Sequence, residues 1–159
     1  MILLIRNTKG INIFEWIFYY LIRLFVNSRY NHAVLLKKQH GVWKVFESHK
    51  KGFRSYKTLE TFIKEQNKYK REILPISLDN FDEERFKSVL FNEYNPRYWK
   101  YLRGKRSISP AEATNCFQSI GYIFHLPRWW AVKPKDIIAY NTNKFTTDEE
   151  SIIDRLEKV

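Results

Sequence analysis

The stretch 32–48 constrains the fold most, because it has the pattern of two strands joined by a tight turn. Ala33–Leu36 is an apolar run, and Gln39-His40-Gly41 is typical of a hairpin turn. Val42–Ser48 then has the alternation of a strand, which places Glu47 on the same face as Trp43 and Val45, with Phe46 on the other face. A hairpin alone is marginally stable in water, so further strands or helices must cover it.

The rest of the chain supplies both kinds of element. Met1–Arg6 has the pattern of a short buried strand, and Arg71–Leu78 that of another, in which Pro75 predicts an edge strand or a bulge. The aromatic and basic stretch Asn95–Pro110 is expected to be mostly loop. This order predicts a single α+β domain over residues 1–159, in which a small antiparallel sheet packs against helices. The expected helices span Asn12–Asn27, Tyr56–Gln66, Asp82–Asn92, Cys116–Phe124 and Pro134–Tyr140, with a last one from Thr146.

The chain is strongly basic. Lys and Arg number 28 against 17 Asp and Glu, which gives a formal net charge of +11 over 159 residues. A field of this sign attracts nucleic acids, anionic lipid headgroups or an anionic cell-wall polymer, although it also serves solubility alone. The basic residues are spread along the chain rather than clustered, so no specific nucleic-acid site is expected.

The apolar stretch Ile11–Val26 raises the question of a membrane span. It contains Glu15 and Arg23 and is too short a run of uninterrupted apolar residues to cross a bilayer. We expect a buried or interfacial helix, and peripheral membrane contact stays an alternative. The pattern of a cleavable signal peptide is not recognised at the start of the sequence. The expected location is therefore the cytoplasm, or a phage or other virus particle.

Cys116 is the only cysteine, which excludes an intramolecular disulfide, a zinc site of several thiolates and CxxC redox chemistry. It lies in the first turn of a predicted helix, directly after the capping residue Asn115. Free N–H groups at such a position stabilise a thiolate and can also hold an oxyanion. The alternative is a buried structural cysteine. The spacings typical of metal ligands and of phosphate-binding glycine loops are not found, so no cofactor is expected.

A cysteine nucleophile needs a base and a group that orients the base. His32 opens the first strand of the hairpin after a polar turn, where a site at the end of the sheet can be open. Glu47 points inward on the paired strand, and an inward carboxylate needs a partner such as a histidine. The alternatives are a solvated Glu47, and His49 as the third member in its place.

The order of these segments resembles the permuted NlpC/P60 papain-like group, specifically its YiiX/YebB-like and lecithin:retinol acyltransferase-like branch. In that group a histidine opens the first core strand, a polar residue ends the second, and a cysteine arrives late at the head of a helix. Permutation explains why histidine precedes cysteine. The segments that carry the resemblance are Ser28-Arg29-Tyr30-Asn31-His32-Ala33-Val34-Leu35, Val45-Phe46-Glu47-Ser48, Gly52-Phe53, Leu59–Ile63 and Asn115-Cys116-Phe117-Gln118-Ser119-Ile120.

The resemblance implies a circularly permuted papain-like fold and a Cys-His-Glu triad of Cys116, His32 and Glu47. The implied activity is a cysteine amidase or peptidase acting on peptidoglycan peptides or another acylated substrate. Phe117-Gln118 stands where the family commonly has Ser-Glu or Ser-Gly, which leaves the substrate preference open. Two other functions remain alternatives: a non-catalytic envelope or virion binding module, and a membrane-associated lipid acyltransferase or thioesterase.

Overall fold

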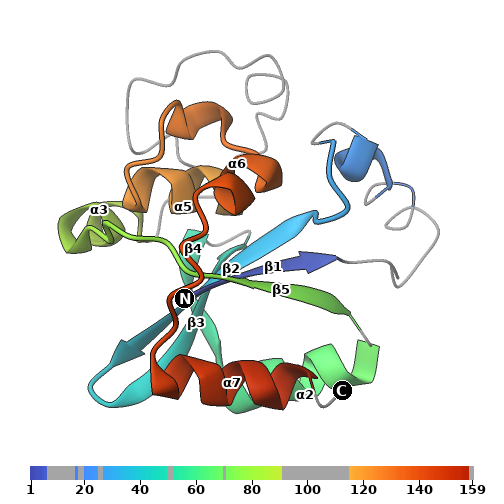
Figure 1. Cartoon of the computed structure of the whole chain (residues 1–159), viewed down its shortest axis with the longest axis vertical. Coiled ribbons are helices and arrows are strands. Elements are labelled where there is room, and N and C mark those ends of the chain that lie inside the picture. The colour runs from blue at the N-terminus through green and yellow to red at the C-terminus, as the bar shows by residue number, and fades with distance from the viewer. Residues whose placement is uncertain are drawn as a thin grey trace.

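A computed structural model describes residues 1–6, 17, 20–24, 27–49, 52–69, 71–90 and 115–157. Its centre is a five-stranded sheet in the order β4-β3-β2-β1-β5, in which each neighbouring pair is antiparallel (Figure 1). The two strands of the predicted hairpin lie side by side near the middle of the sheet. The strands are β1 (Ile2–Arg6), β2 (His32–Gln39), β3 (Val42–His49), β4 (Gly52–Thr58) and β5 (Glu72–Ile76).

Helices cover both faces of the sheet, α3, α5 and α6 on one side and α2 and α7 on the other (Figure 1). Alternate residues of β1 therefore enter two different cores: Ile2 and Leu4 pack with α5, while Leu3 and Ile5 pack with α2 and α7. A strand buried on both faces is apolar throughout. The helices are α2 (Leu59–Tyr69), α3 (Glu83–Val89), α5 (Cys116–Ile123), the 3-10 turn η2 (Trp129–Ala131), α6 (Pro134–Ala139) and α7 (Thr147–Glu157).

The helix α5 is the central element of the first face. Its N-terminus is capped by Asn115, whose side-chain oxygen accepts a hydrogen bond from the Gln118 amide at 3.0 Å. Gly121 lets the η2 segment approach closely, because a Cβ atom built there would lie 2.9 Å from Cγ2 of Val132. The cap fixes where α5 begins, and the absence of a side chain at Gly121 lets α5 pack closely against the η2 segment.

The sequence-based expectations hold for the coarse architecture. The fold is α+β, Asn115 caps α5, and the proline-containing strand β5 lies at an edge of the sheet. The predicted helix Tyr56–Gln66 is wrong at its start, since residues 56–58 end β4 and Thr58 caps α2 by accepting a hydrogen bond from the Thr61 amide at 3.2 Å. The expected loop Asn95–Pro110 lies outside the described residues.

Most of the expected N-terminal helix also lies outside the described residues. Its described part, residues 17 and 20–24, is helical. Within the described ranges, no helix combines the length and the apolar character that crossing a bilayer requires.

Candidate active site

Cys116 is the first residue of α5, as the position of its cap predicts. Helix geometry leaves the N–H groups of Cys116 and Phe117 without acceptors inside the helix. The cysteine is 7% exposed and belongs to the same buried cluster as Ala33 and Phe46, and α5 packs against β2 and β3. The free amides and the sulfur are thus held at one fixed place over the sheet.

His32 is the first residue of β2, where it pairs with Ile5 of β1. Its Nε2 donates a hydrogen bond to Oε2 of Glu47 on β3 at 2.9 Å, and its ring lies close enough to Cys116 for that side chain to raise the pKa of the ring. The structure therefore brings together the three side chains that the sequence singled out. They come from three elements, two of which are adjacent strands and one a helix that follows much later in the chain.

The surroundings of His32 favour its charged form. Burial of the ring lowers its pKa, but the hydrogen bonds and the negative charges of Cys116 and Glu47 outweigh burial and raise the pKa of His32 from 6.5 to about 10. The His32 side chain is 23% exposed.

Glu47 stays ionised in this arrangement. Burial raises its pKa, but the hydrogen bond from His32, the charge of His32 and the ammonium of Lys57 bring the pKa of Glu47 down to about 2. Its side chain is 13% exposed. The inward orientation predicted for Glu47 is thus accompanied by the partner that an inward carboxylate requires.

Lys57 of β4 is a member of the cluster that the sequence reasoning missed. Its Nζ lies 3.0 Å from Oε1 of Glu47 and 2.8 Å from Oε2 of Glu65 on α2. A register shift between Val45 and Phe46 in the pairing of β3 with β4 skips position 56 and sets Lys57 opposite Val45, on the face that Glu47 shares. The Thr58 cap moves the start of α2 and extends β4 through position 57, so it signals that Lys57 belongs to a strand but not that Lys57 lies beside Glu47.

Two of the other histidines lie away from the cluster. His40 is exposed in the hairpin turn, and His125 bonds with Asp82 at 2.8 Å beside α3. His49, the alternative third member, ends β3, but its side chain lies outside the described part of the structure. Among the described residues, no group of three or more His, Cys, Asp or Glu side chains is arranged to hold a metal ion.

The cluster unites the three requirements of thiol chemistry: a sulfur at a helix N-terminus, an imidazole in contact with it and a carboxylate that fixes the imidazole. Comparisons with protein-family models, with curated proteins and with solved structures found no match for the chain.

Proposed function

We propose that this protein is a cysteine hydrolase that cleaves an amide bond, on a circularly permuted papain-like (NlpC/P60) fold. One observation carries the proposal: the only cysteine, at the start of α5, lies close enough to His32 to raise the pKa of its ring, and Nε2 of this histidine bonds a carboxylate at 2.9 Å. Most buried cysteines lie among apolar side chains alone. Cys116 instead lies beside an imidazole that is held in a charged state.

The proposed reaction has two stages. The Cys116 sulfur attacks the carbonyl carbon, and His32 gives a proton to the departing amine, which leaves an acyl thioester on the sulfur. His32 then takes a proton from water, the hydroxide attacks the thioester, and the carboxylic acid is released with the thiol restored. Because Nε2 of His32 is bonded to Glu47, Nδ1 is the nitrogen left to exchange these protons. The amides of Cys116 and Phe117 would hold the oxyanion of both tetrahedral intermediates.

The substrate is proposed from charge. The net charge of +11 favours an anionic substrate, and the peptide cross-bridges of peptidoglycan or another acylated anionic polymer fit that requirement. A non-catalytic module that binds such a polymer is the competing proposal. The hydrolase requires a reactive Cys116 sulfur, whereas the binding module does not.

Alkylation of Cys116 tests the proposal without a known substrate. Since Cys116 is the only cysteine, the mass added by iodoacetamide reports that one site. We expect faster labelling at pH 7 than for free cysteine, and a fall of at least about tenfold in His32→Asn, because the imidazole is lost. The matched variant His40→Asn, at an exposed turn position with φ of 50°, should label like the parent. Slow labelling that His32→Asn leaves unchanged would favour the binding module.

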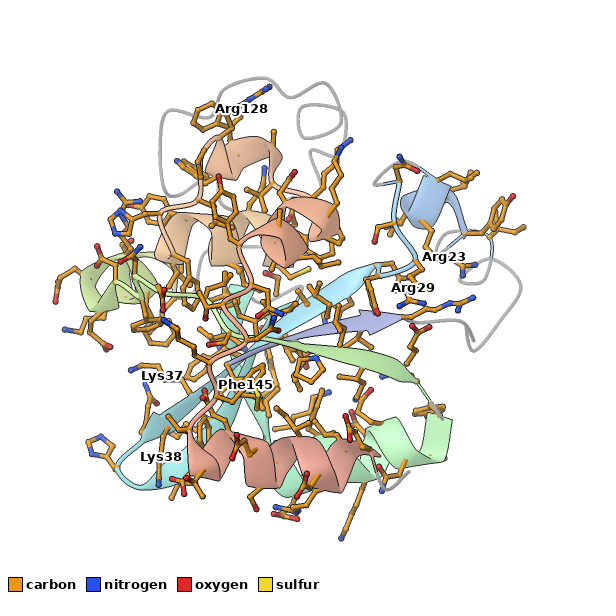
Figure 2. The ribbon with its side chains drawn as sticks, in the orientation of Figure 1. Arg23, Arg29, Lys37, Lys38, Arg128 and Phe145 are labelled. Carbon is orange, nitrogen blue, oxygen red and sulfur yellow. The ribbon has the colours of Figure 1, made fainter. Side chains whose placement is uncertain are left out.

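A second candidate is a thiol acyl hydrolase or acyltransferase that works at a lipid surface. It is favoured by the helical residues 17 and 20–24, among which Ile17, Tyr20, Leu21 and Leu24 are 42, 46, 42 and 58% exposed. Their spacing puts them on one face of the helix. Figure 2 shows Arg23 and Arg29 on the same side of the molecule as this segment, where an anionic headgroup layer would meet them.

Vesicle co-sedimentation tests the second candidate. Leu24→Glu should abolish binding to vesicles that contain phosphatidylglycerol. Val42→Glu, which changes an equally exposed residue (59%) on the β2–β3 hairpin, should bind like the parent. Equal binding of the two variants would remove the lipid-surface candidate.

A further inference from the structure

Lys57 connects the candidate active site to α2 on the opposite face of the sheet from α5. Its ammonium contacts Glu47 at 3.0 Å and Glu65 at 2.8 Å, and its side chain is 22% exposed. It also lies 6.0 Å from the ring centre of Phe62 on α2. A lysine with two carboxylates and an aromatic ring around it is held far more firmly than a surface lysine with one partner.

Both oxygens of Glu47 are occupied as a result. Oε2 accepts from His32 at 2.9 Å, and Oε1 faces Lys57. A glutamate held at one oxygen can still turn about its side-chain bonds, whereas one held at both oxygens has a fixed carboxylate plane. That plane sets the direction of the hydrogen bond to His32, and hence the orientation of the ring.

We propose that Lys57 is a positioning residue, which acts through Glu47 to keep the His32 ring directed at the Cys116 sulfur. This inference rests on the proposed function. Lys57 touches neither the sulfur nor the ring nitrogens, so its effect must pass through the carboxylate. Glu65 completes the arrangement, because it balances the ammonium and ties it to α2.

The charges around Glu47 come from every element packed against it. β2 contributes His32, α5 contributes Cys116, and α2 contributes Glu65 through Lys57. On β4, Arg54 lies opposite Glu47 in the register, and its guanidinium stacks over the Tyr56 ring at 4.7 Å. Lys57 forms the second ion pair of Glu47, beside that with His32, so its removal should change the titration of Glu47 directly.

The test is Lys57→Met, which removes the ammonium and keeps an unbranched apolar stem. The titration of the Glu47 side-chain carboxyl, followed by carbon-13 NMR, should move to higher pH by about one to three pH units, since a cation within hydrogen-bond distance is lost. The alkylation rate of Cys116 at pH 7 should fall at least about threefold. Lys57→Arg keeps the charge, so its Glu47 titration and its Cys116 alkylation rate should both stay close to those of the parent. If Lys57→Met does not fold, Lys57→Gln gives the same two measurements with a neutral donor.

The control is Lys37→Met. Lys37 is 21% exposed, belongs to β2 and pairs with Glu83 at 2.8 Å, and Figure 2 shows it toward the hairpin end of the sheet. This variant loses an equally buried strand lysine with an ion pair, yet should match the parent in both measurements. Labelling of Lys57→Met at the rate of Lys37→Met would overturn the proposal, even where the Glu47 titration moves.

Failure of the inference differs from failure of the proposed function. If the cysteine hydrolase is wrong, the parent itself labels slowly and His32→Asn changes nothing. If only the role of Lys57 is wrong, the parent labels fast and depends on His32, while Lys57→Met behaves like Lys37→Met.

Discussion

Replacing Glu47 by glutamine removes one negative charge from the His32 ring and nearly preserves the shape of the side chain. In the native protein the pKa of His32 is raised to about 10, by hydrogen bonds and charges from Cys116 and Glu47 that outweigh burial. Glu47→Gln leaves the contact with Cys116 in place. The titration of His32 should therefore move to lower pH, but not all the way to the ordinary value of a histidine.

The size of the change follows from the 2.9 Å contact between Nε2 and Oε2. Two opposite unit charges about 4 Å apart attract by ~4 kcal/mol at an effective dielectric constant of ~20, which corresponds to about three pH units. The side chains are 23% and 13% exposed, so water weakens the attraction. We expect the midpoint of His32 to fall by about one to two pH units in Glu47→Gln.

The assay is NMR of the imidazole Hε1 protons as a function of pH. The chain has four histidines, and the signal of His32 is assigned by its loss in His32→Asn. A His32 signal that titrates near pH 6.5 in the parent would refute the reasoning. So would a midpoint that Glu47→Gln leaves in place, because the carboxylate would then not stabilise the imidazolium.

The same ion pair predicts how stability depends on pH. The raised pKa of His32 gives a contribution that is complete below about pH 6.5 and is lost as the pH rises through about 10. The lowered pKa of Glu47 gives one that is complete above about pH 4.5 and is lost as the pH falls toward 2. The His32–Glu47 pair contributes to both shifts and therefore counts once, beside the separate contributions of Cys116 to His32 and of Lys57 to Glu47. The parent should exceed Glu47→Gln in free energy of unfolding by about 1–3 kcal/mol between pH 4.5 and 6.5, and by less at pH 10, as measured in urea.

Two further predictions concern α5. Asn115→Ala removes the oxygen that accepts from the Gln118 amide and should lower the free energy of unfolding by about 1 kcal/mol, whereas Asn115→Asp should not. Gly121→Ala places a methyl group 2.9 Å from Cγ2 of Val132 and should cost about 1–3 kcal/mol in urea denaturation. Gly41→Asn, at an open turn position with φ of +78°, should cost much less, and equal losses would contradict the account of close packing at α5.

The features of the fold that can be predicted from the sequence are those that interactions between neighbouring residues determine. Asn115 marks the start of α5 because a capping side chain acts within three residues of itself. The hairpin follows from alternation on either side of a short turn. Pro75 lies on an edge strand because it cannot donate to a neighbouring strand. In each case the deciding interaction lies within a few positions of the residue that signals it.

Lys57 shows why the rest could not be reached. Residues 52–58 lack a regular apolar alternation, and within β4 only Gly52 and Phe53 are buried, so the helical pattern of Leu59, Phe62 and Ile63 draws the predicted boundary toward the N-terminus. The register shift beside Tyr56 then decides which β4 side chain lies near Glu47. A shift of one residue moves every side chain to the other face. No pattern in the sequence marks where such a shift occurs.

The contact between His32 and Cys116 was likewise not a consequence of local pattern. It was expected only from the resemblance, since nothing in the periodicity of β2 or α5 says that they pack together. The sequence indicates a short set of candidate site residues, and the packing of the folded chain determines which of them lie together.

The charges of the proposed catalytic cluster and the charges that would attract an anionic substrate belong to different residues. With the thiolate formed, His32 and Lys57 are positive while Cys116, Glu47 and Glu65 are negative, so the cluster carries one net negative charge and adds nothing to the positive charge of the chain. The attraction of an anionic polymer must then come from cations elsewhere on the chain.

Salt screens exposed charges over about 8 Å at 0.15 M ionic strength but affects half-buried pairs much less. Raising the salt concentration from 0.05 to 0.5 M should therefore weaken binding of an anionic polymer by at least about tenfold and change the alkylation rate of Cys116 by less than about twofold. A parallel loss of both would mean that the surface charge, and not the pair with His32, sustains the reactivity of the sulfur.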